Sequence, residues 1–153
     1  MTDNIVEVDD LIIYKQLQKE KSSKTFVVCC SHFNKEENAK YNYELFSISR
    51  NHDYICIKDL SNNWYQKQLE FIIEWLKQNV RNMKNVKFIG VSMGGYLANY
   101  LAYYFETTCI TWCPQLNISK DFIEKHYNNS SIIPEMVFED TDTTNIVKHI
   151  NNS

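Results

Sequence analysis

All three glycines of the 153-residue chain lie within one six-residue window, Gly90-Val91-Ser92-Met93-Gly94-Gly95. Glycine is favoured where the backbone takes a positive φ or passes close to another segment. This clustering therefore predicts one turn that is tighter than any other. The window matches G-x-S-x-G, the nucleophile elbow, in which a sharp turn between a strand and a helix exposes a serine hydroxyl. The pattern predicts that Ser92 is a nucleophile; the alternative is a tight turn that matches by chance.

A serine hydroxyl attacks a carbonyl readily only when a base takes its proton and hydrogen-bond donors hold the developing oxyanion. The amide of Met93, at the start of the helix expected after the turn, is the first candidate donor. In such sites the second donor comes from the loop after an earlier strand. That loop is the segment 30–34, so the amides of His32 and Phe33 are the candidates for the second donor.

The acid and the base of such a site are expected after the serine in the chain. An acidic run follows the strand expected over 135–138, and in it Asp142 is our first choice for the acid and Asp140 the second. Both carboxylates could instead cap a helix that begins at Thr143. His149 is the only histidine after Asp142 and is therefore the candidate base. The alternative for His149 is an ordinary surface position on a helix.

Strand-like and helix-like segments alternate along the chain. Apolar runs typical of parallel strands lie at 24–30, 54–58, 86–91, 107–112 and 135–138. Helical spacing predicts a helix up to Val80, which opens with a capping box of Asn63 and Gln66, and a second helix after the elbow. Further helices are expected at roughly 35–49, 119–128 and 143–150. Residues 5–8 and 11–14 are expected to form a small antiparallel edge. The alternation predicts a single α/β domain over 1–153, with a mostly parallel sheet, helices on both faces, and Ser92 at the carboxyl end of a strand.

Composition excludes several classes of function. The net charge of −3 is spread over residues of both signs, which argues against nucleic acid as a partner. The apolar stretches are too short to span a membrane, and the N-terminus does not resemble a signal peptide, so we expect a cytoplasmic protein. The five cysteines have no metal-ligand spacing and are expected to be buried thiols in a reducing compartment, without a metal site: Cys29, Cys30, Cys56, Cys109 and Cys113.

With these motifs placed, the chain resembles the α/β-hydrolase superfamily, and within it small members linked to bacterial capsule and surface-polysaccharide O-acetylation. The segments that carry the resemblance are 88–95, Trp112-Cys113-Pro114-Gln115, 139–142 and 58–65. The resemblance covers about 24–145 and implies a three-layer sandwich, with Ser92 as nucleophile and Asp142 as the acid that orients a histidine. In that family the histidine follows one further strand. The chain therefore either lacks this last strand and its base or uses an unusual histidine.

Two functions from different classes remain open. The first is acyl-ester chemistry through a Ser92 acyl-enzyme, which gives an esterase when water is the acceptor and an O-acyltransferase when a sugar hydroxyl is. This chemistry requires no cofactor, and acetyl-CoA is a candidate acyl donor. Three aromatic residues would line a saccharide site unless they pack in the core: Trp64, Tyr65 and Trp112. The second is a catalytically inactive binding or accessory protein of a polysaccharide pathway. A short sheet with an exposed edge also predicts a homodimer or a partner that completes the sheet.

Overall fold

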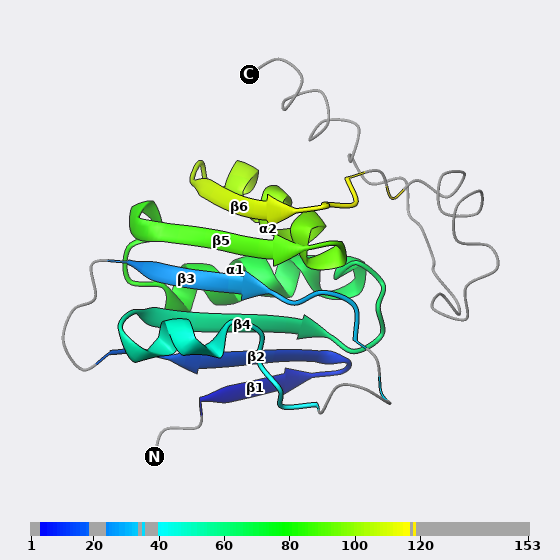
Figure 1. Cartoon of the computed structure of the whole chain (residues 1–153), viewed down its shortest axis with the longest axis horizontal. Helices are drawn as coiled ribbons and strands as arrows, with labels where there is room; N and C mark the ends of the chain where they lie inside the picture. The colour runs from blue at the N-terminus through cyan, green and yellow to red at the C-terminus, as the bar shows by residue number, and fades with distance from the viewer. Residues whose placement is uncertain (1–3, 19–23, 34, 36–39, 117, 119–153) are drawn as a thin grey trace.

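The centre of the molecule is a six-stranded sheet with the order β1-β2-β4-β3-β5-β6 (Figure 1). The structure is a computed structural model, and it describes residues 4–18, 24–33, 35, 40–116 and 118. The strands are β1 (Ile5–Val8), β2 (Leu11–Gln16), β3 (Thr25–Cys29), β4 (Asp53–Asp59), β5 (Val86–Val91) and β6 (Thr108–Trp112). The first two strands form the expected antiparallel edge, while β4, β3, β5 and β6 run parallel to one another.

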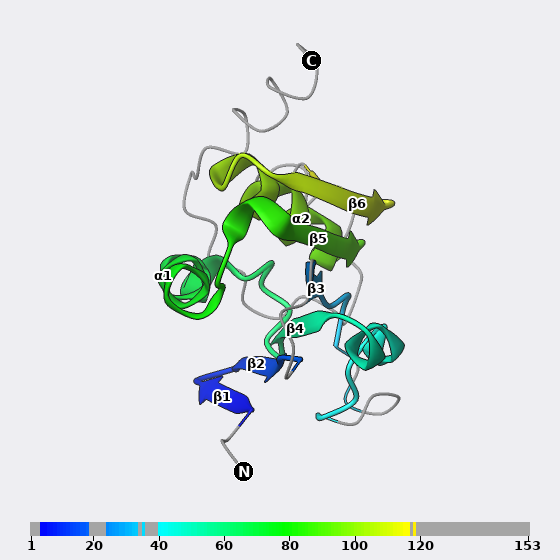
Figure 2. The same ribbon diagram turned by 90° about the vertical axis from the view of Figure 1, so that its left-hand side faces the viewer.

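Two α-helices and three short 3₁₀-helices accompany the sheet in the described residues. They are α1 (Leu69–Asn79), α2 (Met93–Tyr104), η1 (Phe46–Arg50), η2 (Gln66–Gln68) and η3 (Met83–Asn85). Helices α1 and α2 cover one face, where they bury Ile72, Leu76 and Leu97, and η1 lies on the other face, where Ile48 packs near Tyr54 (Figure 2). The predicted fold class, a mostly parallel sheet with helices on both faces, is confirmed.

Strand β3 lies between β4 and β5, and this order decides where a site can form. Cys29 at the end of β3 is opposite Ile57 on one side and Gly90 on the other. The chain leaves β3 towards β4, then crosses back to β5 and continues outwards to β6. Ligands bind at such a reversal of strand order, outside the carboxyl ends of the strands. The loops that follow β3 and β5 meet there.

Some expected elements differ from the observed ones. In the described part of 35–49 the backbone forms turns and the start of η1, so the α-helix expected there is wrong for those residues. The capping box is also wrong, because α1 begins at Leu69 with Gln68 at its N-cap. Asn63 lies in a tight loop instead. The expected segments 119–128, 135–138 and 143–150 lie outside the described residues. Within the described part of the chain, no helix is long and apolar enough to cross a membrane.

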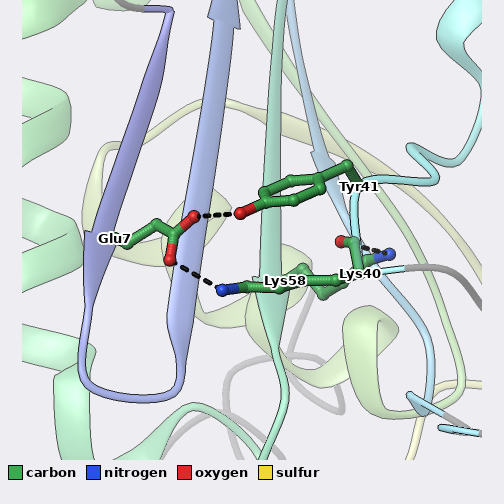
Figure 3. A network of polar contacts seen from close by, with 4 residues as sticks. All are labelled: Glu7, Lys40, Tyr41 and Lys58. Atoms are coloured by element: carbon green, nitrogen blue, oxygen red, sulfur yellow. Dashed lines mark hydrogen bonds and ion pairs between the residues drawn. The ribbon is translucent and has the colours of Figure 1, made fainter.

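A polar network ties the edge strand β1 to the loop that precedes η1 (Figure 3). The Glu7 carboxylate accepts hydrogen bonds from Lys40 Nζ and from the Tyr41 hydroxyl, each at 2.7 Å. These two bonds hold the pKa of Glu7 below its ordinary value. Lys58, which is buried in β4, donates to the carbonyl oxygen of Asn42 at 2.5 Å. The loop around 40–42 is therefore held against the sheet from two strands.

Candidate active site

Ser92 occupies the turn between β5 and α2, with φ 52° and ψ −118°. Residues other than glycine avoid this region, and holding one there costs about 1–3 kcal/mol. The surroundings fix the turn through main-chain hydrogen bonds. The Ser92 N–H donates to the Trp112 carbonyl at 3.0 Å, and the Ser92 carbonyl accepts from the amides of Tyr96 at 3.3 Å and Gln115 at 3.4 Å. The predicted sharp turn at the serine is therefore present.

None of the three glycines of the elbow has a positive φ, and two of them, Gly90 and Gly94, are needed for space. A Cβ on Gly90 would lie 2.2 Å from the carbonyl oxygen of Gly94. A Cβ on Gly94 would lie 2.0 Å from the carbonyl oxygen of Cys29 and 2.5 Å from that of Cys30. The first turn of α2 is thus packed directly onto the end of β3, which places the elbow beside the loop that follows β3.

Met93 is the first residue of α2, and its amide lies at the helix N-terminus. The amide of Tyr96 is the first to bond back along the chain, to Ser92, so the amides of the first turn precede the helical ladder. These amides carry the positive end of the helix dipole. The use of the Met93 amide as an oxyanion donor stays a prediction.

The amides of Ser31, His32 and Phe33, in the described part of the loop after β3, differ in their hydrogen bonds. The Ser31 amide donates to the Glu44 carboxylate at 3.0 Å, and the Phe33 amide donates to Asn62 Oδ1 at 2.7 Å. The His32 amide between them has no hydrogen-bond partner among the described residues. Of the two candidates for the second oxyanion donor, Phe33 is therefore engaged elsewhere, and His32 is the one retained.

Two of the three aromatic residues expected to line a saccharide site belong to the core. Trp64 is buried and its Nε1–H donates to Gln115 Oε1 at 3.0 Å. Tyr65 has no exposed surface, its hydroxyl donates to the Cys30 carbonyl at 2.6 Å, and burial raises its pKa well above the ordinary value. The prediction that these two side chains line a substrate site is wrong, because neither presents a free face. Trp112 differs: it is 52% exposed at the end of β6.

A buried carboxylate that we did not predict as a site residue organises the loop 59–65. Asp59 has no exposed surface, and its carboxylate accepts bonds from the amides of Ser61, Asn63 and Tyr65 at 2.9, 2.9 and 3.0 Å. The Ser61 hydroxyl donates to it at 2.7 Å. An aspartate before a Ser-Asn-Asn run is a recognisable turn signal, and it could have located this loop.

The remaining predicted site residues cannot be placed beside Ser92. Asp142, its alternative Asp140, and His149 lie outside the described residues. Among the described residues there is no group of three metal-ligating side chains. The thiol at the end of β3, Cys29, is fully buried, and burial raises its pKa well above the ordinary value. Cys113, by contrast, is exposed and follows Trp112, whose carbonyl accepts a hydrogen bond from the Ser92 amide. Ser92 as the nucleophile stays a prediction.

Solved structures of low sequence identity share this fold. The capsule O-acetyltransferase of Neisseria meningitidis serogroup A has a TM-score of 0.63 at 20% identity, over 93% of this chain and 61% of that one. A mutant of the same enzyme in complex with CoA has a TM-score of 0.61 at 19% identity, over 96% and 64%. A sugar hydrolase from Lactococcus lactis has a TM-score of 0.55 at 12% identity, over 93% of this chain and 62% of that one. An α/β hydrolase from a deep-sea metagenome library has a TM-score of 0.51 at 16% identity, over 78% of this chain and 60% of that one.

The chain therefore has an α/β-hydrolase-like fold and spans about three fifths of the length of these enzymes. A search of curated protein sequences gave no match. A family profile matches residues 36–149, a range that includes β4, the loop 59–65, the elbow and β6. On this match, the chain belongs to an uncharacterised protein family, UPF0227.

Proposed function

We propose that the chain carries out acyl-ester chemistry with Ser92 as the nucleophile. The observation that carries the proposal is the left-handed backbone of Ser92 at the end of β5, held by main-chain hydrogen bonds and by the close contacts of Gly90 and Gly94. In the first step Oγ attacks an ester or thioester carbonyl while a base takes the hydroxyl proton. The alcohol or thiol leaves with that proton, and the acyl group stays on Ser92.

The amides of Met93 and His32 would hold the oxyanion in this step. Met93 supplies the N-terminus of α2, and His32 supplies the amide without a partner in the described loop after β3. Removing one oxyanion donor from a serine enzyme costs about 10²–10³ in kcat, so the pair would contribute much of the rate. The base we propose is His149, oriented by Asp142, with Asp140 as the alternative acid.

The acceptor in the second step distinguishes two activities. Water gives an esterase, and a saccharide hydroxyl gives an O-acyltransferase. The exposed Trp112 favours a saccharide, because its main-chain carbonyl is bonded to the Ser92 amide and sugars stack on aromatic faces. The O-acetyltransferase with a related fold, and its complex with CoA, support acetyl-CoA as a donor and a polysaccharide pathway as the setting. A homodimer, or a partner that completes the sheet, remains a prediction.

Reaction with a fluorophosphonate, followed by intact mass, tests the nucleophile. We expect one adduct on the wild type and none on Ser92→Ala. Ser47→Ala is the matched control, because Ser47 is an exposed serine on η1, away from the elbow, and this variant should keep the adduct. A folded wild type that forms no adduct would refute the serine chemistry and favour a protein that binds acyl or saccharide ligands without catalysis.

A second assay separates the two acceptors once the nucleophile is established. Hydrolysis of p-nitrophenyl acetate reports transfer to water, and release of the CoA thiol from acetyl-CoA only when a saccharide is added reports transfer to sugar. We expect His149→Ala to suppress both activities and His126→Ala to preserve them. Equal activity of these two variants would show that His149 is not the base.

A further inference from the structure

Side chains hold the two residues that flank His32, whose amide has no hydrogen-bond partner among the described residues. On one side, Glu44 accepts bonds from the Ser31 amide at 3.0 Å and from the Ser31 hydroxyl at 2.6 Å. On the other side, the Asn62 side chain bonds both main-chain groups of Phe33: Oδ1 accepts from the amide at 2.7 Å, and Nδ2 donates to the carbonyl at 2.9 Å. The orientation of the intervening His32 peptide is thus set by its two neighbours.

The chemistry of asparagine explains how Asn62 holds Phe33. A carboxamide presents one acceptor and one donor side by side, so it can pair with the N–H and C=O of a single residue as a neighbouring strand would. Asn62 itself has φ 55°, a left-handed conformation that asparagine tolerates better than most residues. An aspartate could keep only the acceptor half of this pairing.

The loop that carries Asn62 is also linked to the elbow, through Gln115. Its backbone is fixed by the buried carboxylate of Asp59, and Trp64 in the same loop donates to the side chain of Gln115 at 3.0 Å. The main-chain N–H of Gln115 in turn donates to the Ser92 carbonyl oxygen at 3.4 Å. The loop 59–65 therefore holds both halves of the candidate site, namely the turn that presents the nucleophile and the loop that presents the second oxyanion donor.

From this arrangement we infer that Asn62 is a positioning residue, which aims the His32 amide at the oxyanion by holding Phe33. The inference rests on the proposed function, since an oxyanion forms only if Ser92 reacts with a carbonyl. Asn62 makes no contact with the reacting atoms in this assignment. Its loss should therefore weaken stabilisation of the tetrahedral species while leaving substrate binding in place.

The test compares Asn62→Gly, Asn62→Asp and Asn82→Gly in the full chain. Glycine removes the carboxamide but keeps the left-handed backbone accessible, so Asn62→Gly avoids backbone strain. Asn82→Gly is the matched control, since Asn82 Oδ1 also bonds a main-chain amide, that of Lys84, but at the opposite end of β5. For p-nitrophenyl acetate we expect Asn62→Gly to lower kcat by about 10–100-fold, less than loss of a donor, with KM within about threefold. The affinity for a phenylboronic acid, which forms a tetrahedral adduct with serine, should fall by the same factor.

Asn62→Asp should fall between Asn62→Gly and the wild type, because it retains the bond to the Phe33 amide. It also keeps the test decisive if Asn62→Gly does not fold. If the wild type is active but both Asn62 variants match Asn82→Gly in kcat and in boronic acid affinity, the positioning role is refuted and the serine chemistry stands. If the wild type forms no fluorophosphonate adduct, the proposed function fails first, and this inference fails with it.

Discussion

The adjacent glycines of α2 offer a matched pair of substitutions, because alanine meets very different surroundings at the two positions. At Gly94 an added Cβ lies 2.0 Å from the Cys29 carbonyl oxygen, a backbone atom of the central strand β3. At Gly95 the nearest atoms are Cα and Cβ of Pro114, both at 3.0 Å, in a segment that follows the sheet. We therefore expect Gly94→Ala to destabilise the protein and Gly95→Ala to leave its stability nearly unchanged.

The magnitude follows from two terms. Replacing glycine by alanine inside a helix gains about 1 kcal/mol in either variant. Overpacking costs about 1–3 kcal/mol. Gly94→Ala belongs at the upper end of this range, because the added Cβ and the Cys29 carbonyl oxygen must separate by about 1.4 Å, from 2.0 Å to an ordinary contact of 3.4 Å. Gly95→Ala belongs at the lower end, since a few tenths of an ångström suffice. The expected difference is about 2 kcal/mol, which corresponds to about 4–8 °C in Tm for a chain of this size.

Urea unfolding and thermal melting would measure the difference, and fluorophosphonate labelling would report the elbow. Gly94→Ala should also be labelled more slowly, because the start of α2 moves away from the loop that carries His32. Gly95→Ala should be labelled at nearly the wild-type rate. Equal stability and equal labelling of the two variants would refute the argument that the first turn of α2 is packed onto the end of β3.

Three further predictions concern single groups. Asp59→Asn should destabilise the protein by about 3 kcal/mol in urea unfolding, because the new side-chain NH₂ group would face main-chain N–H groups that now donate to the carboxylate. Glu74→Gln, at an exposed position, should change stability little, and equal effects of the two variants would contradict this argument. Ser92→Gly should raise the free energy of unfolding by about 0.5–2 kcal/mol, because relief of the strained φ at residue 92 exceeds the entropic cost of glycine. A loss of stability would show that the backbone of Ser92 is not strained. Native protein should contain one fast-reacting thiol, Cys113, and Cys113→Ser should remove it. The thiols of Cys29, Cys30 and Cys56 are buried, and burial raises the pKa of the half-buried Cys109. A second fast-reacting thiol would contradict the observed burial.

The parts of the fold that follow from local pattern could be predicted from the sequence. The apolar, β-branched runs predicted β3, β4, β5 and β6 to within a residue or two. For β3, β4 and most of β5 the reason is that strands buried on both faces carry a continuous apolar signal. The elbow was predictable because its close main-chain contacts exclude every side chain larger than a hydrogen atom at Gly90 and Gly94.

The parts that depend on tertiary contact could not be predicted in the same way. The loop 59–65 takes left-handed backbone at Asn62, Trp64 and Tyr65, so the usual glycine signal for such turns is missing. The buried carboxylate of Asp59 stabilises this loop against the helical start that the spacing of Asn63 and Gln66 suggests. The burial of Trp64 and Tyr65 likewise follows from the loop's contacts with Gln115 and the end of β3, which no local pattern reveals.

The elbow is held almost entirely by main-chain atoms, and this has an evolutionary consequence. Gly94 is confined by the carbonyl of Cys29, and Ser92 is bonded to the carbonyl of Trp112 and the amide of Gln115. Main-chain groups are the same whichever side chain is attached, so substitutions at these neighbours can accumulate while the turn keeps its shape. Divergence should therefore erase most sequence similarity around the elbow before it erases the geometry. More distant members of the family should be easier to find by the spacing of the glycines and the strand ends than by the identity of the surrounding residues.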